Sequence, residues 1–138
     1  PTDNPVIEGP DIAMQETKLN EFDAIRRQIT KCHGEMLMHI MSEDFDKVDD
    51  YIAGNFTSEE YPDHKAYIES MQSRFANIDL ASAEVNWGLR NFEQNKDGTV
   101  QCQYFLDITT EDEHEVSLKY QELWIKDDGH WQLLRLNT

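Results

Sequence analysis

The stretch VSLKYQELWIKDDGHWQLLRL, from Val116 to Leu136, predicts the fold of this chain. Apolar residues alternate with polar ones on both sides of Asp128-Gly129, a dipeptide that readily takes the positive φ values of a two-residue hairpin turn. With this turn, Glu122 faces Arg135 across two antiparallel strands. Opposite charges in directly opposed positions attract each other, so this pair is the first candidate site.

The same period-two alternation marks the residues before this hairpin, where turn residues separate the segments. With Asp97-Gly98 as a two-residue loop, Leu89 pairs with Leu106, and Asn91 therefore pairs with Tyr104. A three-residue loop around Asp112 keeps the faces of the next pair of strands in phase. The residues from 85 to 136 are thus predicted to form a curved antiparallel sheet of four or more strands.

The first half of the chain repeats apolar residues every three or four positions, which predicts amphipathic helices. The first helix is expected from Ile12 to Met41, with Gly34 inside it as a point of close packing or a bend. A second is expected to begin at Ser42 as its cap and to end at Gly54-Asn55, and a third to have Pro62 as its first residue. Three helices packed on one sheet define an α+β fold.

The proline distribution suggests how the chain is divided. Residues 1–11 hold three of the four prolines and show no apolar period, so they are expected to form an extended arm. Residues 12–138 then form a single domain, the usual size for one hydrophobic core. The connection FTSEEY, at 56–61, is short enough to pair as a brief strand.

The charge balance excludes several classes of partner. Acidic residues outnumber basic ones 28 to 12, which gives a formal net charge of −16. Such a field repels phosphate backbones and anionic lipid headgroups, so neither nucleic acid nor a membrane surface is an expected partner. No run of residues approaches the roughly 20 apolar residues of a membrane span.

No metal or cofactor is expected from the sequence. The acidic runs SEDFDKVDD and TEDEHE lack the ligand spacing and the turn glycine of a calcium-binding loop. Cys32 and Cys102 have no further cysteine nearby to complete a zinc site and are expected to be buried free thiols. No glycine-rich phosphate loop precedes a helix, which argues against a nucleotide.

The start of the chain has neither the basic residues nor the apolar segment of a signal peptide, so we expect a cytoplasmic protein. A trimmed signal peptide would leave the same kind of start.

The hairpin WIKDDGHWQL, from Trp124 to Leu133, preceded by three helices and a curved antiparallel sheet, resembles the nuclear-transport-factor-2-like superfamily, which includes polyketide cyclases (SnoaL-like proteins) and ketosteroid isomerases. The resemblance covers roughly Ala13 to Leu136. It implies a cone-shaped, cystatin-like fold in which the helices close over the concave sheet and leave a pocket. It also implies dimers that form through the sheet. The superfamily contains isomerases, cyclases, dehydratases and transport adaptors, so the fold alone does not select a function.

The predicted inner face of the sheet is apolar at one end and polar at the other. We expect the ligand-binding residues of the pocket to be Trp87, Asn91, Tyr104, Tyr120, Glu122 and Arg135. In isomerases of the superfamily, tyrosines donate hydrogen bonds to a ligand carbonyl, which is what the resemblance implies for Tyr104 and Tyr120. The alternative is that both tyrosines are core aromatics with their hydroxyl groups at the rim.

Glu122 is the strongest candidate for chemistry, because a carboxylate on an inward face needs a compensating partner. Arg135 as that partner would lower the pKa of the carboxyl group and weaken it as a base, which favours ligand binding over proton abstraction. The pair can also serve only to fix the register of the hairpin. His33 is the second catalytic candidate, because it can point from the first helix into the pocket.

The predicted outer face of the sheet carries more apolar residues than a solvated face needs. Such a patch is typical of a partner surface, so we expect a homodimer joined through Phe105, Leu123, Ile125, Leu134 and Leu136.

Three functions remain open from the sequence. The first is a non-catalytic domain that binds a small, mainly apolar ligand between helices and sheet. The second is a small isomerase, cyclase or dehydratase that moves a proton on a carbonyl compound. The third is a dimeric protein-interaction module whose pocket is filled by its own side chains.

Overall fold

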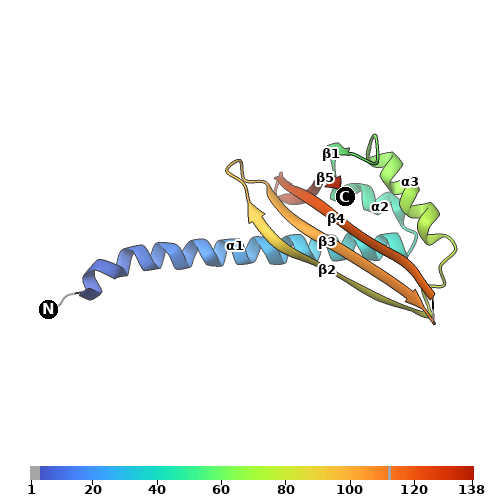
Figure 1. Ribbon diagram of the computed structural model, residues 1–138. Coiled ribbons are helices and arrows are strands. Elements are labelled where there is room, and N and C mark those ends of the chain that lie inside the picture. The colour runs from blue at the N-terminus through green and yellow to red at the C-terminus, as the bar shows by residue number, and fades with distance from the viewer. Residues whose placement is uncertain (1–3, 112) are drawn as a thin grey trace.

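The computed structural model describes residues 4–111 and 113–138 of the chain (Figure 1). The helices lie in the first part of the chain together with strand β1, and five strands form one curved sheet, so the predicted α+β class is confirmed. In chain order the elements are α1 (Asn4–Met41), α2 (Phe45–Val48), the 3-10 helix η1 (Asp49–Tyr51), β1 (Ile52–Ser58), α3 (His64–Phe75), β2 (Ala83–Gln94), β3 (Val100–Thr110), β4 (Glu113–Asp127) and β5 (His130–Asn137). The strand order in the sheet is β1-β5-β4-β3-β2.

Helix α1 is longer than predicted. It begins at Asn4, so the extended arm predicted for residues 1–11 is wrong from Asn4 onward. Pro5 falls in the first turn, where its missing N–H would have no partner in the helix anyway. Figure 1 shows the first half of α1 projecting beyond the sheet and the second half running along it. Among the described residues, no helix is both long enough and apolar enough to cross a membrane.

The second half of α1 packs closely against β2 at Gly34. A Cβ atom on Gly34 would lie 3.2 Å from Cζ2 of Trp87, closer than ordinary van der Waals contact. The close packing predicted at this glycine is confirmed. Four apolar side chains of this half are buried in the core, namely Ile29, Met36, Leu37 and Ile40.

The second predicted helix ends earlier than expected. Helix α2 and η1 together stop at Tyr51, and Ile52 begins strand β1 instead of a further helical turn. Strand β1 pairs in parallel with β5, with Ile52 opposite Leu133, and Ile52 and Phe56 are both buried in the core. The sheet therefore has five strands, and the brief strand predicted within residues 56–61 is the end of β1.

Helix α3 begins slightly later than predicted. Asp63 caps it by accepting a hydrogen bond from the backbone N–H of Ala66 at 2.9 Å, and Pro62 precedes the cap. Its inner face buries Tyr67, Met71 and Phe75.

The strands keep their predicted faces except beyond two irregularities, and the first pair of strands is shifted. Leu89 lies opposite Tyr104 and Trp87 opposite Leu106, two residues away from the predicted pairing. The loop between β2 and β3 is longer than two residues, and an irregularity follows Arg90, where Asn91 takes a φ of +56°. A shift by two residues leaves the side chains of residues 83–90 on their predicted faces, but the register changes by one residue between Arg90 and Glu93, which exchanges the faces beyond Arg90.

The pairing of β3 with β4 agrees with the prediction from Val100 to Ile108: Leu106 lies opposite Leu118, Tyr104 opposite Tyr120 and Cys102 opposite Glu122. Asp112, the centre of the predicted loop, lies outside the described residues.

The hairpin of β4 and β5 has the predicted turn, with φ values of +49° at Asp128 and +80° at Gly129. Its far end differs from the prediction. Trp124 lies opposite Leu133, but Leu123 lies opposite Arg135, so Leu134 is an extra residue that shifts the register. As a result Leu136, and not Arg135, lies opposite Glu122 on the inner face.

Candidate functional site

A buried pair of polar side chains, His33 on α1 and Glu122 on β4, lies at the centre of the candidate site. Nε2 of His33 is 3.0 Å from Oε2 of Glu122, and the two residues are only 1% and 2% exposed. An ionised carboxylate can only accept hydrogen bonds, so Nε2 of His33 carries the proton when Glu122 is charged. The pair joins α1 to the middle of the sheet.

The second carboxylate oxygen of Glu122 also has partners. The indole N–H of Trp124 donates to Oε1 at 3.0 Å, and the thiol of Cys102 donates to the same oxygen at 3.9 Å. Burial raises the pKa of Cys102, and the negative charge of Glu122 raises it further, so this thiol stays protonated. Glu122 is thus a buried carboxylate with hydrogen-bond donors on both oxygens.

The other ring nitrogen of His33 is different. Nδ1 is buried and has no hydrogen-bond partner among the described residues. Aromatic rings surround the imidazole: Tyr104 at 4.1 Å between ring centroids, Trp87 at 5.4 Å and Trp124 at 5.9 Å. A polar atom buried in this way without a partner is destabilising by about 1–3 kcal/mol.

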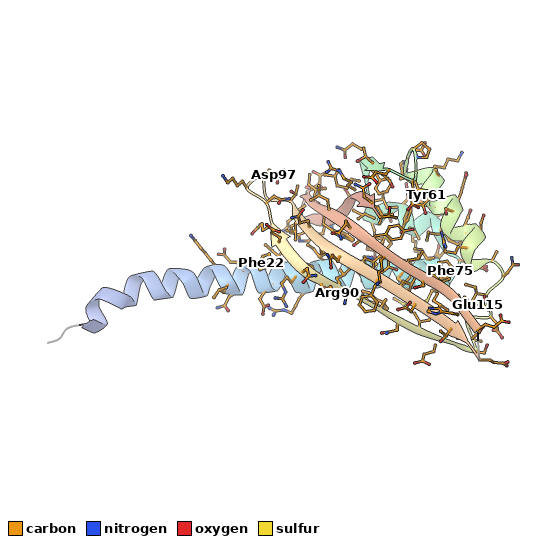
Figure 2. All side chains as sticks on the ribbon, viewed as in Figure 1. Phe22, Tyr61, Phe75, Arg90, Asp97 and Glu115 are labelled. Atoms are coloured by element: carbon orange, nitrogen blue, oxygen red, sulfur yellow. The ribbon has the colours of Figure 1, made fainter. Side chains whose placement is uncertain are left out.

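Tyrosine hydroxyl groups gather on the α3 side of this pair. The rings of Tyr104 and Tyr120 stack at 6.4 Å, the hydroxyl oxygens of Tyr120 and Tyr61 are 3.4 Å apart, and the ring of Tyr67 meets that of Tyr61 edge-on. Figure 2 shows the side chains of the sheet and of α3 that fill this region, with Tyr61 and Phe75 labelled.

Tyr104 and Tyr67 stay protonated. Burial raises the pKa of Tyr104 far above its usual value, and the neighbouring Tyr67 and Glu122 raise it further. Burial also raises the pKa of Tyr67, and the negative charge of Glu122 raises it further. Both are therefore neutral hydroxyl groups that can donate hydrogen bonds at any physiological pH.

The structure brings together most of the residues predicted to line a pocket. Trp87, Tyr104, Tyr120 and Glu122 lie on the inner face, and the two catalytic candidates, Glu122 and His33, contact each other directly. Whether these residues bind a ligand stays a prediction. The sequence reasoning missed Tyr61 and Tyr67, although the position of Tyr67 on the apolar face of α3 already pointed inward.

Two of the predicted residues lie elsewhere. Arg135 is exposed, so the predicted pairing of Glu122 with Arg135 is wrong. Both residues border a hollow of 210 Å³ at the end of the sheet, but no ion pair joins them in the described chain. Asn91 is also exposed, and its amide donates to Oε1 of Gln103 at 2.7 Å on the outer side.

The outer face of the sheet keeps four of the five residues predicted for a dimer. Phe105, Leu123, Ile125 and Leu134 are partly buried there, and the guanidinium of Arg90 covers the ring of Phe105 at 5.2 Å. Leu136 is fully buried in the core, so its assignment to the outer face is wrong. The homodimer itself stays a prediction.

Two large hollows lie away from the His33 and Glu122 pair. One, of 560 Å³, lies between α1, η1 and the β4–β5 hairpin and includes Glu35, Asp50, Asp127 and Asp128. The other, of 570 Å³, lies between α2 and α3 and includes Asp46, Asp49, Asp63 and Glu69. Within the described ranges, no three His, Cys, Asp or Glu side chains come close enough together to hold a metal ion.

Comparisons with known proteins place the fold. No protein-family model matches the sequence, and no curated protein matches it. Among solved structures, Aln2 from a Streptomyces species is similar with a TM-score of 0.65 and 12% identity, over 83% of this chain and 88% of that one.

A protein of the Rd1NTF2 series is similar with a TM-score of 0.63 and 16% identity, over 83% of this chain and 96% of that one. A protein of unknown function with a cystatin-like fold, from Nostoc punctiforme, has a TM-score of 0.63 and 11% identity, over 81% and 87% of the two chains. At these identities the likeness concerns the fold alone. The chain therefore has the cone-shaped, cystatin-like α+β fold of the nuclear-transport-factor-2-like superfamily, as its C-terminal hairpin predicted.

Proposed function

We propose that this protein binds a small, mainly apolar molecule between α1 and the sheet, with a hydroxyl group of that molecule on Nδ1 of His33. The observation that supports the proposal is the buried, unpartnered Nδ1, next to a nitrogen that Glu122 holds in place. A native protein pairs nearly all of its buried polar atoms, so an exception between the helix and the sheet suggests a missing partner.

The chemistry of the pair selects the group that can fill this position. With Glu122 ionised and His33 neutral, Nδ1 has a free lone pair and accepts a hydrogen bond. With His33 protonated, Nδ1 donates instead. A hydroxyl group serves both states, because it can donate and accept, whereas a carbonyl or an ether serves only the second.

The surroundings of Nδ1 select the rest of the molecule. The rings of Trp87, Tyr104 and Trp124 offer apolar contact around the imidazole, and the neutral hydroxyl groups of Tyr67 and Tyr104 add donors for further polar atoms. Trp87 is only partly buried, so the proposed ligand would enter from its side of the imidazole. An alcohol or phenol with an apolar body meets all of these conditions.

Binding of naphthol compared with naphthalene tests the proposal. The two probes differ only in the hydroxyl group, and we expect naphthol to bind about tenfold more tightly, the effect of one net hydrogen bond of about 1.4 kcal/mol. His33→Phe should remove this difference, because phenylalanine has no ring nitrogen. Calorimetry or the fluorescence of the probe gives both affinities, and native mass spectrometry of the purified protein looks for a natural ligand.

His39→Phe is the matched control, because it makes the same substitution on the same helix at a partly buried position next to Tyr51. It should leave both affinities unchanged. Equal affinity of the unsubstituted protein for naphthol and naphthalene would contradict the proposal. Failure of both to bind would favour an interaction module whose interior is filled by its own side chains.

A second function is favoured by one feature of the same geometry. Glu122 accepts from Nε2 of His33, so the lone pair of Nδ1 is available to take a proton, which is how a carboxylate prepares a histidine as a general base. The reaction class would be proton removal next to a carbonyl, with a tyrosine hydroxyl group donating to the carbonyl oxygen.

Deuterium exchange tests this second function without knowledge of the natural substrate. If Nδ1 acts as a base, tetralone in heavy water should incorporate deuterium next to its carbonyl faster with the protein than without it. His33→Gln should abolish the acceleration, while His39→Gln should retain it. Mass spectrometry of the recovered ketone measures the exchange, and equal rates with and without protein would leave ligand binding as the function.

A further inference from the structure

A shallow hollow between α1 and β2 differs in charge from the two larger hollows. It has a volume of 380 Å³ and is lined by Arg26, Arg27, Thr30 and Lys31 on α1 and by Leu89 and Phe92 on β2. We refer to it as the basic hollow. Figure 2 labels one residue on each of the two elements, Phe22 on α1, one turn before Arg26, and Arg90 on β2.

The concentration of positive charge is unusual for this chain. The protein has only 12 basic residues against 28 acidic ones, and the two larger hollows are each bordered by four carboxylates. Three of the 12 basic residues fall within six positions of α1, at 26, 27 and 31, and all three line the basic hollow. Their spacing puts them along one side of the helix.

Internal ion pairs leave part of this charge uncompensated. Asp23 is the shared partner of both arginines: Nη1 of Arg27 is 2.9 Å from its carboxylate and Nη1 of Arg26 is 3.7 Å away. Lys31 makes no ion pair within the described residues. The single carboxylate of Asp23 is therefore shared by two arginines, and the charge of Lys31 is not compensated by an ion pair in this part of the chain.

The apolar side chains of the basic hollow lie next to its cationic side chains. The guanidinium of Arg26 lies over the ring of Phe92, 5.8 Å from its centroid, and Leu89 lies on the same strand. The hydroxyl group of Thr30 already donates to the backbone carbonyl of Arg26, so it does not compete for a ligand as a donor. The hollow thus presents cationic donors next to an aromatic and an aliphatic side chain.

We infer that the basic hollow binds an apolar molecule that carries a carboxylate. The planar guanidinium groups of Arg26 and Arg27 match the geometry of a carboxylate, and Lys31 adds a further donor. Phe92 and Leu89 contact the apolar body. The overall negative charge of the protein opposes polyanions more strongly than monoanions, which excludes polyphosphates and nucleic acid strands as ligands of this hollow.

Naphthoate tests the inference against naphthalene and naphthylmethylamine, which have the same ring system without charge and with a positive charge. Naphthoate is expected to bind with a Kd of about 1 mM, the affinity typical of a ligand of this size in an open site. Amide chemical shifts in ¹⁵N-labelled protein should change around Arg26, Lys31 and Phe92 for naphthoate alone. The combined substitution of Arg26→Gln and Arg27→Gln should weaken binding roughly tenfold or more.

Lys47→Gln is a matched control, since Lys47 is an exposed cation on α2, away from the hollow, that pairs with Asp44. It should change the affinity less than twofold. The inference is overturned if naphthylmethylamine binds as well as naphthoate, if no shifts change at several millimolar, or if Lys47→Gln weakens binding as much as the arginine substitutions. His33→Phe leaves naphthoate binding intact, so failure of the interior site and failure of the basic hollow are distinguishable.

Discussion

Replacing Glu122 with leucine is expected to lower the free energy of unfolding by about 3 kcal/mol or more, because two buried N–H groups lose their acceptor and each buried polar group left unpaired costs about 1–3 kcal/mol. The carboxylate accepts hydrogen bonds from both His33 and Trp124, and leucine accepts none. Two buried N–H groups then lose their partners while their surroundings stay closed to water. Denaturation by urea, followed by tryptophan fluorescence and circular dichroism, measures the change.

A double substitution separates the loss of the pair from the loss of the glutamate itself. Leucine at both His33 and Glu122 replaces the pair by apolar groups of similar size, and such replacements are often neutral or stabilising. The double variant should therefore be more stable than Glu122→Leu alone. Glu113→Leu, at an exposed position of the same strand, is the control and should change stability by no more than about 0.5 kcal/mol. If the effects of Glu122→Leu and of His33→Leu, each measured alone, add up to the effect of the double substitution, His33 and Glu122 do not interact in solution.

The cone fold was predictable because the strands of the sheet appear in the sequence as alternation separated by turn residues. The pairing of β3 with β4 follows directly from this alternation, since both strands bury one face and a slip by one residue would expose it. The Asp128-Gly129 turn was predictable for a different reason, namely the positive φ values that it requires. In both cases the residues of the strands and of the turn themselves were enough to predict the structure.

The candidate site was predictable only in part, because the partner of Glu122 comes from a distant part of the chain. The sequence indicated that an inward carboxylate needs a partner, and that requirement is met, but by His33, 89 residues earlier. The apolar stripe of α1 shows which side of the helix faces the sheet, but not how far along the sheet each residue lies. Cross-strand neighbours are the only contacts that alternation specifies, which is why Arg135 was predicted instead.

Irregularities in the strands account for the other differences. A bulge adds one unpaired residue to a strand, and the alternation of apolar and polar residues in the sequence does not reveal its position. The irregularity after Arg90 and the extra residue Leu134 each move the register by one residue and exchange the faces beyond them, which is why Asn91 lies on the outer side. Everything that follows Leu134 in β5 therefore lies on the opposite face from the one predicted.

Because of the bulge at Leu134, alanine substitutions of the two leucines on either side of Arg135 should lower the free energy of unfolding by different amounts. Leu136 is fully buried opposite Glu122, so Leu136→Ala should lower the free energy of unfolding by about 2–5 kcal/mol, the usual effect of leaving a cavity in a core. Leu134 is only partly buried on the outer face, so Leu134→Ala should have a smaller effect, about 1 kcal/mol. Urea denaturation of the two variants measures both values.

The comparison of these two variants distinguishes the two registers of the hairpin, because the substitution is the same and the positions are two residues apart. In a strand without a bulge, residues 134 and 136 share one face and become buried or exposed together. Similar effects of the two substitutions would therefore contradict the bulge and return Arg135 to the inner face beside Glu122. Arg135→Ala provides the complementary measurement: at its exposed position it should change stability by no more than about 0.5 kcal/mol, whereas removal of a buried partner of Glu122 would have an effect several times larger.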